Sequence, residues 1–277
     1  MPEVEHGIYH IEEIAPGAYK IYERRDASMY LVCGKEKACL IDAGFGLNDL
    51  KALVAELTAL PVVLVNTHGH EDHVLGNHWF YDGGARRVFL HPADQSMYRA
   101  IVSGYAKMLA DPWVKENYAE FLRGFDPSAV RFPEAEDIRD GDTIDLGGKI
   151  LEVIELPGHT AGSILLLDRD AKICYSGDAV IEHAWLFLPE SLPLEAYAAA
   201  LRRARLILGD AGVERIYDGH YSNCPLTLAH MDTVIAGLER ALAGEAEARP
   251  FQNREGSGVE YVFDELSVLA RAPEKHP

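Results

Sequence analysis

Residues 62–73 read VVLVNTHGHEDH, an apolar run followed by a run of polar and charged residues. The apolar run Val62 to Val65 predicts a fully buried strand. The strand leads directly into a polar segment that contains three histidines and an aspartate. Functional side chains in open α/β layers gather at the carboxyl ends of strands, so this segment is the first candidate site. Its candidate residues are His68, His70, Asp72 and His73.

The density of imidazole and carboxylate groups in this segment indicates metal binding. Such ligands suit zinc, iron or manganese, and a bound cation offsets the cost of burying them. The alternative is a polar surface loop. The metal is favoured because three more turns follow apolar runs and contain a glycine, which lets the backbone approach a shared site closely. These turns contribute His159, Asp178 and His220.

Outside these turns, the hydrophobic spacing predicts strands and helices mixed along the chain. Met29 to Leu40 is a candidate β-hairpin, because two β-rich runs flank the turn Gly34-Lys35-Glu36-Lys37. Helices are expected at 193–209 and 225–243, where a proline opens each pattern and a glycine closes it.

We expect a single domain over residues 1–277, since no linker is long enough to separate two domains. Two amphipathic patterns within 94–122 predict a helical cap insertion. Residues 245–277 form a C-terminal extension with β-like runs. The cap and the extension offer surfaces for a second subunit, which makes a homo-oligomer an open possibility.

The signature H-x-H-x-D-H followed by His, Asp and His resembles that of the metallo-β-lactamase superfamily, and the resemblance spans Asp42 to His220. It implies an α/β (α+β) fold, a four-layer αββα sandwich with a two-metal site along one edge. By position, His68, His70 and His159 would hold the first ion, Asp72, His73 and His220 the second, and Asp178 would bridge them. His70 stands where the flavodiiron branch carries Glu, which favours hydrolysis over oxygen reduction.

The resemblance implies a metal-dependent hydrolase with two divalent ions, zinc foremost and iron or manganese as alternatives. Two ions about 3.5 to 4 Å apart lower the pKa of a shared water towards about 7 and so supply hydroxide as the nucleophile. Asp72 is the predicted catalytic residue, because it can orient the hydroxide or carry its proton. Asp42 is expected to accept a hydrogen bond from a ligand imidazole. The alternative for Asp42 is a turn residue at a strand end.

Aromatic residues near these ligands predict a pocket for a small-molecule substrate. His183, Trp185 and Phe187 follow the bridging aspartate closely, and Tyr105 lies on a helix of the predicted cap. For the aromatic residues of the cap, packing onto the rest of the fold is the alternative interpretation. A surface position is the alternative for His183.

Departures from two branches of the superfamily narrow the substrate. Glyoxalase II members carry a basic residue and an aromatic residue where this chain has Phe187 and Pro189, which disfavours glutathione thioesters. Acyl-homoserine lactonases carry a tyrosine where this chain has Ile181. The expected substrate is therefore another small ester, thioester, lactone or phosphodiester. Two alternatives stay open: a mononuclear iron oxidoreductase of the persulfide-dioxygenase type, and a non-catalytic metal-binding protein.

The composition limits which binding partners and which cellular location are expected. The net charge is −18, so the long-range field repels nucleic acids and anionic membranes, and neither is expected as a partner. No apolar run reaches the length of a membrane span. The four cysteines form no C-x-x-C pair, and the acidic N-terminal segment lacks the pattern of a signal peptide. We expect a cytoplasmic protein.

Overall fold

The computed structural model describes residues 4–23, 27–83, 88–119, 126–220 and 224–272 of the chain. It divides into two compact units. Unit 1 comprises Met1–Ile138 and Ile144–Ile150, and unit 2 comprises Arg139–Thr143 and Leu151–Pro277. The single-domain organisation expected from the sequence stays a prediction.

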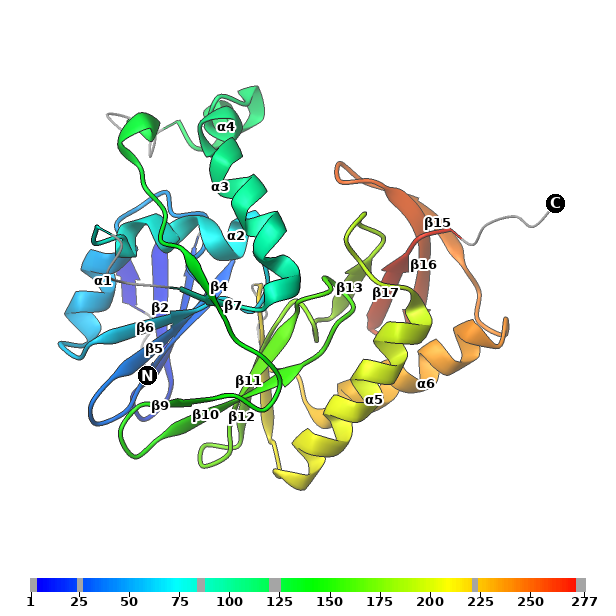
Figure 1. Cartoon of the computed structure of the whole chain (residues 1–277). Helices are drawn as coiled ribbons and strands as arrows, with labels where there is room; N and C mark the ends of the chain where they lie inside the picture. The colour runs from blue at the N-terminus through cyan, green and yellow to red at the C-terminus, as the bar shows by residue number, and fades with distance from the viewer. Residues whose placement is uncertain (1–3, 24–26, 84–87, 120–125, 221–223, 273–277) are drawn as a thin grey trace. The chain divides into compact units, whose positions relative to one another are not determined.

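Unit 1 is built on an eight-stranded sheet whose strands follow one another in chain order (Figure 1). The strands up to β5 pair antiparallel, and β5, β6, β7 and β8 pair parallel. The strands are β1 Val4–His6, β2 Tyr9–Ala15, β3 Ala18–Glu23, β4 Ser28–Cys33, β5 Ala38–Ile41, β6 Val62–Val65, β7 Val88–Leu90 and β8 Ala135–Asp137. The predicted hairpin of residues 29–40 is confirmed as β4 and β5.

The helix that connects β5 to β6 shows how the sequence fixes the parallel part of this sheet. Helix α1, Leu50–Leu57, begins where the Asp49 carboxylate accepts a hydrogen bond of 2.9 Å from the Ala52 amide. The apolar residues Leu50, Leu53 and Val54 recur at helical spacing and are buried. The helix returns the chain to the start of β6, so the polar segment after Val65 lies at the carboxyl end of a parallel strand. The prediction of a fully buried strand is wrong in its first half, because Val62 and Val63 are partly exposed and only Leu64 and Val65 are buried.

The remaining helices of unit 1 begin within this segment or after it, and α2 contains its residues Asp72 and His73. They are α2 Glu71–Val74, α3 Gln95–Leu109, α4 Pro112–Asn117 and the 3₁₀ turns η1 Leu75–Phe80, η2 Pro92–Asp94 and η3 Pro127–Ala129. Helices α3 and α4 occupy the predicted insertion at 94–122, of which residues 120–122 lie outside the described part of the chain. Tyr98 and Tyr105 of α3 are buried in the hydrophobic core of unit 1.

Unit 2 contains strands that pair in the order β14-β12-β11-β10, in which the β12–β14 pair is parallel and the other two pairs are antiparallel. These strands are β10 Ile150–Glu155, β11 Ile164–Asp168, β12 Ile173–Gly177 and β14 Arg215–Asp218. Strand β9, Thr143–Asp145, is divided, since Thr143 belongs to unit 2 and Ile144 and Asp145 belong to unit 1. A second sheet has the order β13-β17-β16-β15. Its strands are β13 His183–Leu186, β15 Arg249–Gln252, β16 Ser257–Phe263 and β17 Leu266–Ala270. The predicted C-terminal β-like extension therefore forms part of a sheet.

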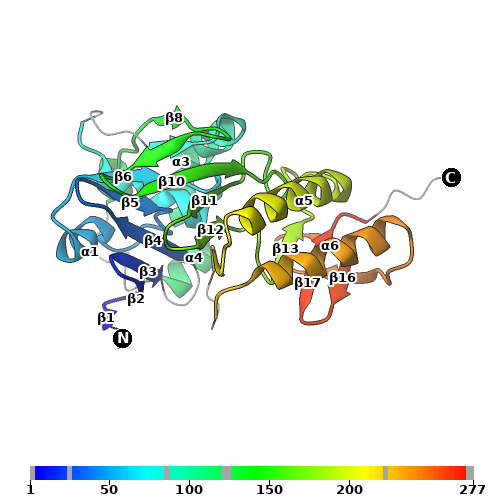
Figure 2. The same ribbon diagram turned by 90° about the horizontal axis from the view of Figure 1, so that it is seen from below.

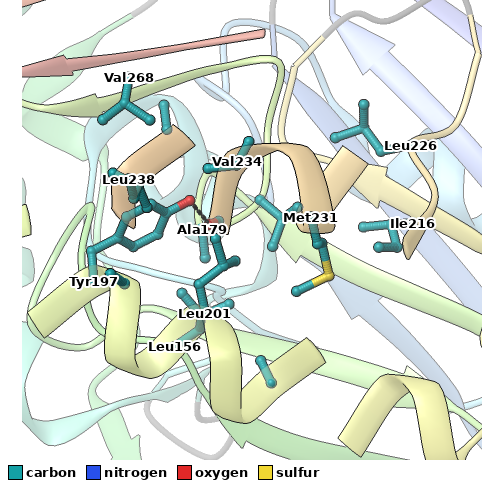
Figure 3. Close-up of a cluster of buried hydrophobic side chains, with 14 of the residues drawn as sticks. Leu156, Ala179, Tyr197, Leu201, Ile216, Leu226, Met231, Val234, Leu238 and Val268 are labelled. Carbon is teal, nitrogen blue, oxygen red and sulfur yellow. Dashed lines mark hydrogen bonds between the residues drawn. The ribbon is translucent and has the colours of Figure 1, made fainter. Parts of the chain in front are cut away.

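Two long helices cover the sheets of unit 2. Helix α5, Leu194–Asp210, and helix α6, Leu228–Leu242, lie side by side, and α6 contacts β16 and β17 (Figure 2). Both helices were predicted from the sequence. Their apolar faces meet in one hydrophobic core with the strands, and Figure 3 shows Leu201, Val234 and Leu238 in it. Among the described residues, no helix has the length and apolar character needed to span a membrane.

Strand β13 was not predicted. Its four residues, HAWL, are too few to show an alternating pattern, and its partner β17 lies more than eighty residues further along the chain. The pairing is parallel, with His183 beside Ser267 and Trp185 beside Leu269. Two of the predicted pocket residues therefore lie on a strand, with their directions fixed by the sheet.

Candidate metal centre

The first set of donor residues lies in unit 1, in the segment between β6 and η1. His68 and His73 are buried, and His70 and Asp72 are partly buried. The Nε2 atom of His68 lies 3.1 Å from Nδ1 of His70, and Nε2 of His73 lies 3.5 Å from Oδ2 of Asp72. The ligand atoms of His68 and His73 lie within 4.8 Å of each other. The four candidates of the first motif thus form one cluster.

Asp42 holds this cluster from the end of β5. Its Oδ1 accepts a hydrogen bond of 2.7 Å from the Thr67 amide, and its Oδ2 accepts one of 2.8 Å from the Thr67 hydroxyl. The same Oδ2 lies 2.9 Å from Nδ1 of His73, which must donate because a carboxylate only accepts. Asp42 has a φ of 62°, a left-handed conformation that aspartate tolerates better than most residues. It therefore fixes both the loop and the His73 ring.

Two further polar residues support the same segment, and sequence reasoning missed both. The Asp94 carboxylate accepts a hydrogen bond of 3.0 Å from the amide of Gly69. The Asn66 side-chain amide donates a hydrogen bond of 2.8 Å to the carbonyl of His73. Both residues are buried. Their position after a strand is the feature of the sequence that could have identified them. Asn66 directly follows β6, and Asp94 comes four residues after β7.

The second set of donors lies in unit 2, at three separate turns. His159 follows β10, Asp178 follows β12, and His220 follows β14. Oδ2 of Asp178 lies 3.5 Å from Nε2 of His159 and 3.1 Å from Nε2 of His220. The side chains of His159 and Asp178 are 4% and 11% exposed and that of His220 is 32% exposed, so the cluster opens to solvent at His220.

Backbone groups and one serine hydroxyl hold the His159 turn in place. Nδ1 of His159 lies 2.8 Å from the Trp185 carbonyl and must donate to it. The Ser191 hydroxyl donates a hydrogen bond of 2.8 Å to the His159 carbonyl, and the Leu192 amide donates one of 2.8 Å to the Gly158 carbonyl. At the third turn, Oδ1 of Asp218 accepts a hydrogen bond of 3.2 Å from the His220 amide. Asp218 and Ser191 were not among the predicted site residues.

The donor chemistry of each unit, taken by itself, fits a cation. In the neutral rings of His73 and His159, the Nδ1 hydrogen is committed to Asp42 and to the Trp185 carbonyl. Each Nε2 then carries a lone pair, and it faces a carboxylate oxygen at 3.5 Å. Two electron-rich atoms repel each other unless a positive charge lies near both. Imidazole nitrogen with carboxylate oxygen is a donor set that zinc, iron and manganese accept.

The predicted pocket residues of unit 2 have different degrees of exposure. His183 is exposed, and its Nδ1 lies 3.0 Å from the Ser267 hydroxyl. Trp185 is partly buried and its ring centroid lies 5.2 Å from that of Phe187. Phe187 is buried and its ring centroid lies 4.9 Å from that of Phe251. Substrate contact by these three residues stays a prediction.

Tyr105, the pocket candidate of unit 1, is only 3% exposed. Its ring centroid lies 5.3 Å from that of Phe132 and 5.9 Å from that of His78. Burial raises the pKa of Tyr105, and the nearby charge of Glu23 raises it further. Burial also lowers the pKa of His78, although its hydrogen bond to the Gly46 carbonyl opposes this. Tyr105 thus packs in the core of unit 1, as the alternative interpretation of the cap aromatics expects.

Comparison with known proteins gives one consistent result. The family description "Metallo-beta-lactamase superfamily" matches residues 22–220. A Gallus gallus protein named acyl-coenzyme A thioesterase MBLAC2 is 30% identical over 234 residues, which cover 78% of this chain and 78% of the relative. A Haemophilus influenzae protein named hydroxyacylglutathione hydrolase GloC is 27% identical over 150 residues, which cover 53% of this chain and 63% of the relative.

The solved structures agree with this result at the level of the fold. A structure described as a metallo-beta-lactamase from Pontibacter korlensis matches with a TM-score of 0.61 at 17% identity. The match covers 83% of this chain and 99% of that chain. The predicted fold class, a mixed α/β fold of the metallo-β-lactamase type, is confirmed.

Proposed function

The chain belongs to the metallo-β-lactamase superfamily and is a hydrolase of that superfamily, and we propose that it cleaves acyl thioesters with two divalent metal ions, zinc foremost. The observation that carries the proposal is the pair of donor clusters, in which carboxylate oxygens face imidazole nitrogens at 3.1 to 3.5 Å. Clusters of this composition are suited to cations and are costly to bury without them.

The ligand assignment is part of the proposal and follows the family resemblance. By this assignment His68, His70 and His159 would hold one ion, Asp72, His73 and His220 would hold the other, and Asp178 would be shared by both. When bound, such ions polarise a scissile carbonyl and lower the pKa of water to about 7.

The residues of the chain itself orient the donors and carry the proton. Asp42 and the Trp185 carbonyl fix the rings of His73 and His159 with their Nε2 atoms available as ligands. Asp72, with a side chain that is 17% exposed, is the residue proposed to accept the proton of the attacking water. Passing that proton to the departing sulfur would complete the cleavage, with a carboxylic acid and a thiol as products.

The thioester is favoured among the bond classes expected from the sequence because the Gallus gallus relative, named an acyl-coenzyme A thioesterase, shares 30% identity over 78% of both chains. The charge of the chain bears on whether a coenzyme A thioester can bind. The chain carries a net charge of −18, which opposes the approach of polyanionic coenzyme A at long range. A test therefore needs thioesters with and without the nucleotide.

The experiment measures hydrolysis by the full chain after removal of metal and reconstitution with zinc, manganese or iron. The panel pairs acetyl- and longer acyl-coenzyme A thioesters with the matching thioesters of N-acetylcysteamine, which lack the nucleotide. Oxygen esters of the same acyl groups, a lactone and a bis-aryl phosphodiester complete it. Chelator-sensitive release of thiol, at least about tenfold faster than cleavage of the matched oxygen esters, is the expected result.

Two outcomes of this panel overturn the proposal. Cleavage of the lactone or the phosphodiester in preference to every thioester would contradict the proposed substrate class. It would leave the assignment of the chain as a hydrolase intact. Buffer-rate hydrolysis of the whole panel together with oxygen uptake by the iron form would favour the oxidoreductase alternative.

The proposal also covers the cellular location of the protein and the kind of molecule that it binds. The substrate is a small molecule, and the setting is the reducing cytoplasm, which the four free cysteines Cys33, Cys39, Cys174 and Cys224 support. Nucleic acids and membranes are not proposed as partners, because the net charge of −18 repels both.

A further inference from the structure

Tyr197 lies in the first turn of α5 and points into the core of unit 2 (Figure 3). The residue is 2% exposed. Its ring packs directly against Gly158, so closely that a methyl group added there would overlap the ring carbon Cδ2. Gly158 immediately precedes His159. The ring therefore supports the backbone of the turn that presents this histidine.

The hydroxyl group of the same side chain reaches a second turn. It donates a hydrogen bond of 3.0 Å to the carbonyl of Ala179, drawn as a dashed line in Figure 3. Ala179 immediately follows Asp178. Burial raises the pKa of Tyr197, which keeps the hydroxyl protonated and therefore able to donate throughout the neutral range. One side chain thus contacts the residue before His159 and the residue after Asp178.

The segment that leads into α5 strengthens this arrangement. The Ser191 hydroxyl and the Leu192 amide donate to the carbonyls of His159 and Gly158. The Tyr197 amide donates to the Pro193 carbonyl, which starts the helix. Further along, Leu201 and Leu208 anchor the helix in the core. The position of Tyr197 is therefore fixed by the packing of a 17-residue helix.

We propose that Tyr197 is a positioning residue that sets the separation between Nε2 of His159 and Oδ2 of Asp178, 3.5 Å in the structure. The inference rests on the proposed function, in which both residues are metal ligands. Tyr197 touches neither the ions nor the substrate in this proposal. It acts through Gly158 and Ala179, one peptide unit away from each ligand.

The test compares Tyr197→Phe with Tyr261→Phe. The first variant keeps the ring against Gly158 and removes only the hydrogen bond to Ala179. The second removes a hydroxyl from another buried tyrosine of the same core, remote in sequence from both turns. Zinc affinity is measured by competition with a chromophoric chelator, and the visible absorption of the cobalt-substituted protein reports on ligand geometry. The stability of each metal-free variant is followed by thermal unfolding.

We expect Tyr197→Phe to weaken zinc binding about 3- to 10-fold, the usual effect of one buried neutral hydrogen bond, and to shift the cobalt absorption. Tyr261→Phe is expected to leave both unchanged. Gly158→Ala, which forces the ring away, is expected to have the larger effect on both measurements. In turnover, Tyr197→Phe is expected to lower kcat more than it raises KM, because substrate contacts are retained.

The outcomes separate this inference from the proposed function. Zinc affinity and cobalt absorption of Tyr197→Phe that match those of Tyr261→Phe would overturn the positioning role, even if wild-type protein hydrolyses thioesters. A wild-type protein that binds zinc but cleaves no thioester would remove the substrate class, while a shifted cobalt spectrum in Tyr197→Phe would still support the positioning role. A wild-type protein that binds no metal would overturn both.

Discussion

The two units present their donor residues in different ways. In unit 1, all four donors come from the six residues His68 to His73, directly after one strand. In unit 2, three donors come from three turns that are distant in sequence. A local motif supplies one set, and the sheet topology assembles the other. The effect of a substitution should therefore depend on which of the two sets it disturbs.

The groups that hold the donors differ as well. In unit 1 they are side chains. The Asp42 carboxylate accepts from the His73 ring, the Asn66 amide donates to the His73 carbonyl, and the Asp94 carboxylate accepts from the Gly69 amide. In unit 2 they are mainly backbone groups and the hydroxyls of Ser191 and Tyr197. The carboxylates of Asp42 and Asp94 are charged acceptors in unit 1. In unit 2 the Asp218 carboxylate accepts from the His220 amide, but the His159 and Asp178 turns rely on neutral hydrogen bonds and packing. Charge-assisted hydrogen bonds are the stronger kind.

The largest expected effect comes from removing a proposed ligand. Asp178→Asn keeps the size of the side chain but removes the charge that faces His159 and His220. Loss of a hydrogen bond to a ligand typically costs about 10- to 100-fold in metal affinity, so loss of a ligand should cost more than about 100-fold. Zinc content after dialysis and thioester turnover should fall together.

Asp170→Asn is the matched control, since it makes the same chemical change at an exposed turn of the same unit. Full zinc content with retained turnover in Asp178→Asn would contradict the bridging assignment.

A smaller effect is expected from the charged acceptor of unit 1. Asp42→Asn should lower zinc affinity about 10- to 100-fold, because an amide offers only one acceptor oxygen where the carboxylate serves Thr67 and His73 with two. Isothermal titration of zinc into the metal-free variant measures this. Asparagine tolerates the left-handed φ of 62° at this position, so backbone strain does not confuse the result.

Asp264→Asn provides the control for Asp42→Asn, because Asp264 is exposed and has a similar φ of 58°. Equal zinc affinities in the two variants would show that the Asp42 carboxylate has no part in holding His73 for a metal.

The smallest expected effect comes from a neutral hydrogen bond in unit 2. Ser191→Ala removes the bond of 2.8 Å to the His159 carbonyl. Since the Leu192 amide still holds the turn, zinc affinity should fall by no more than about fivefold, the equivalent of about 1 kcal/mol. Ser103→Ala removes a similar hydroxyl-to-carbonyl bond on the exposed side of α3 and should have no effect on zinc affinity. If Ser191→Ala lowered zinc affinity as much as Asp42→Asn does, the proposed difference between the supporting hydrogen bonds of the two units would be wrong.

The sequence predicts the donors of unit 1 well because they are neighbours in the chain. The strand Val62–Val65 is predictable as a short unbroken apolar run, and the helices α1, α5 and α6 are predictable because their apolar residues recur with the helical period. For His159, Asp178 and His220 the sequence shows three similar turns, and only the pairing of β10, β11, β12 and β14 brings those turns together.

The supporting residues are harder to predict, for a physical reason. Asp94 and Ser191 act through hydrogen bonds to residues 25 and 32 positions away, and such long-range bonds leave no pattern in the sequence. Tyr197 has the spacing of an ordinary core residue on a helix, and its hydroxyl bond is visible only in the structure. Strand β13 is too short for its pattern to be recognised.

The proposed dinuclear thioester hydrolysis is tested by measuring thiol release from an acyl thioester while zinc is titrated into the metal-free protein. We predict no turnover without metal, a rise as zinc is added and a plateau at two ions per chain, with Asp178→Asn inactive throughout. Turnover that persists in excess chelator, or its absence when two ions are bound, would contradict the assignment of this chain as a dinuclear thioester hydrolase.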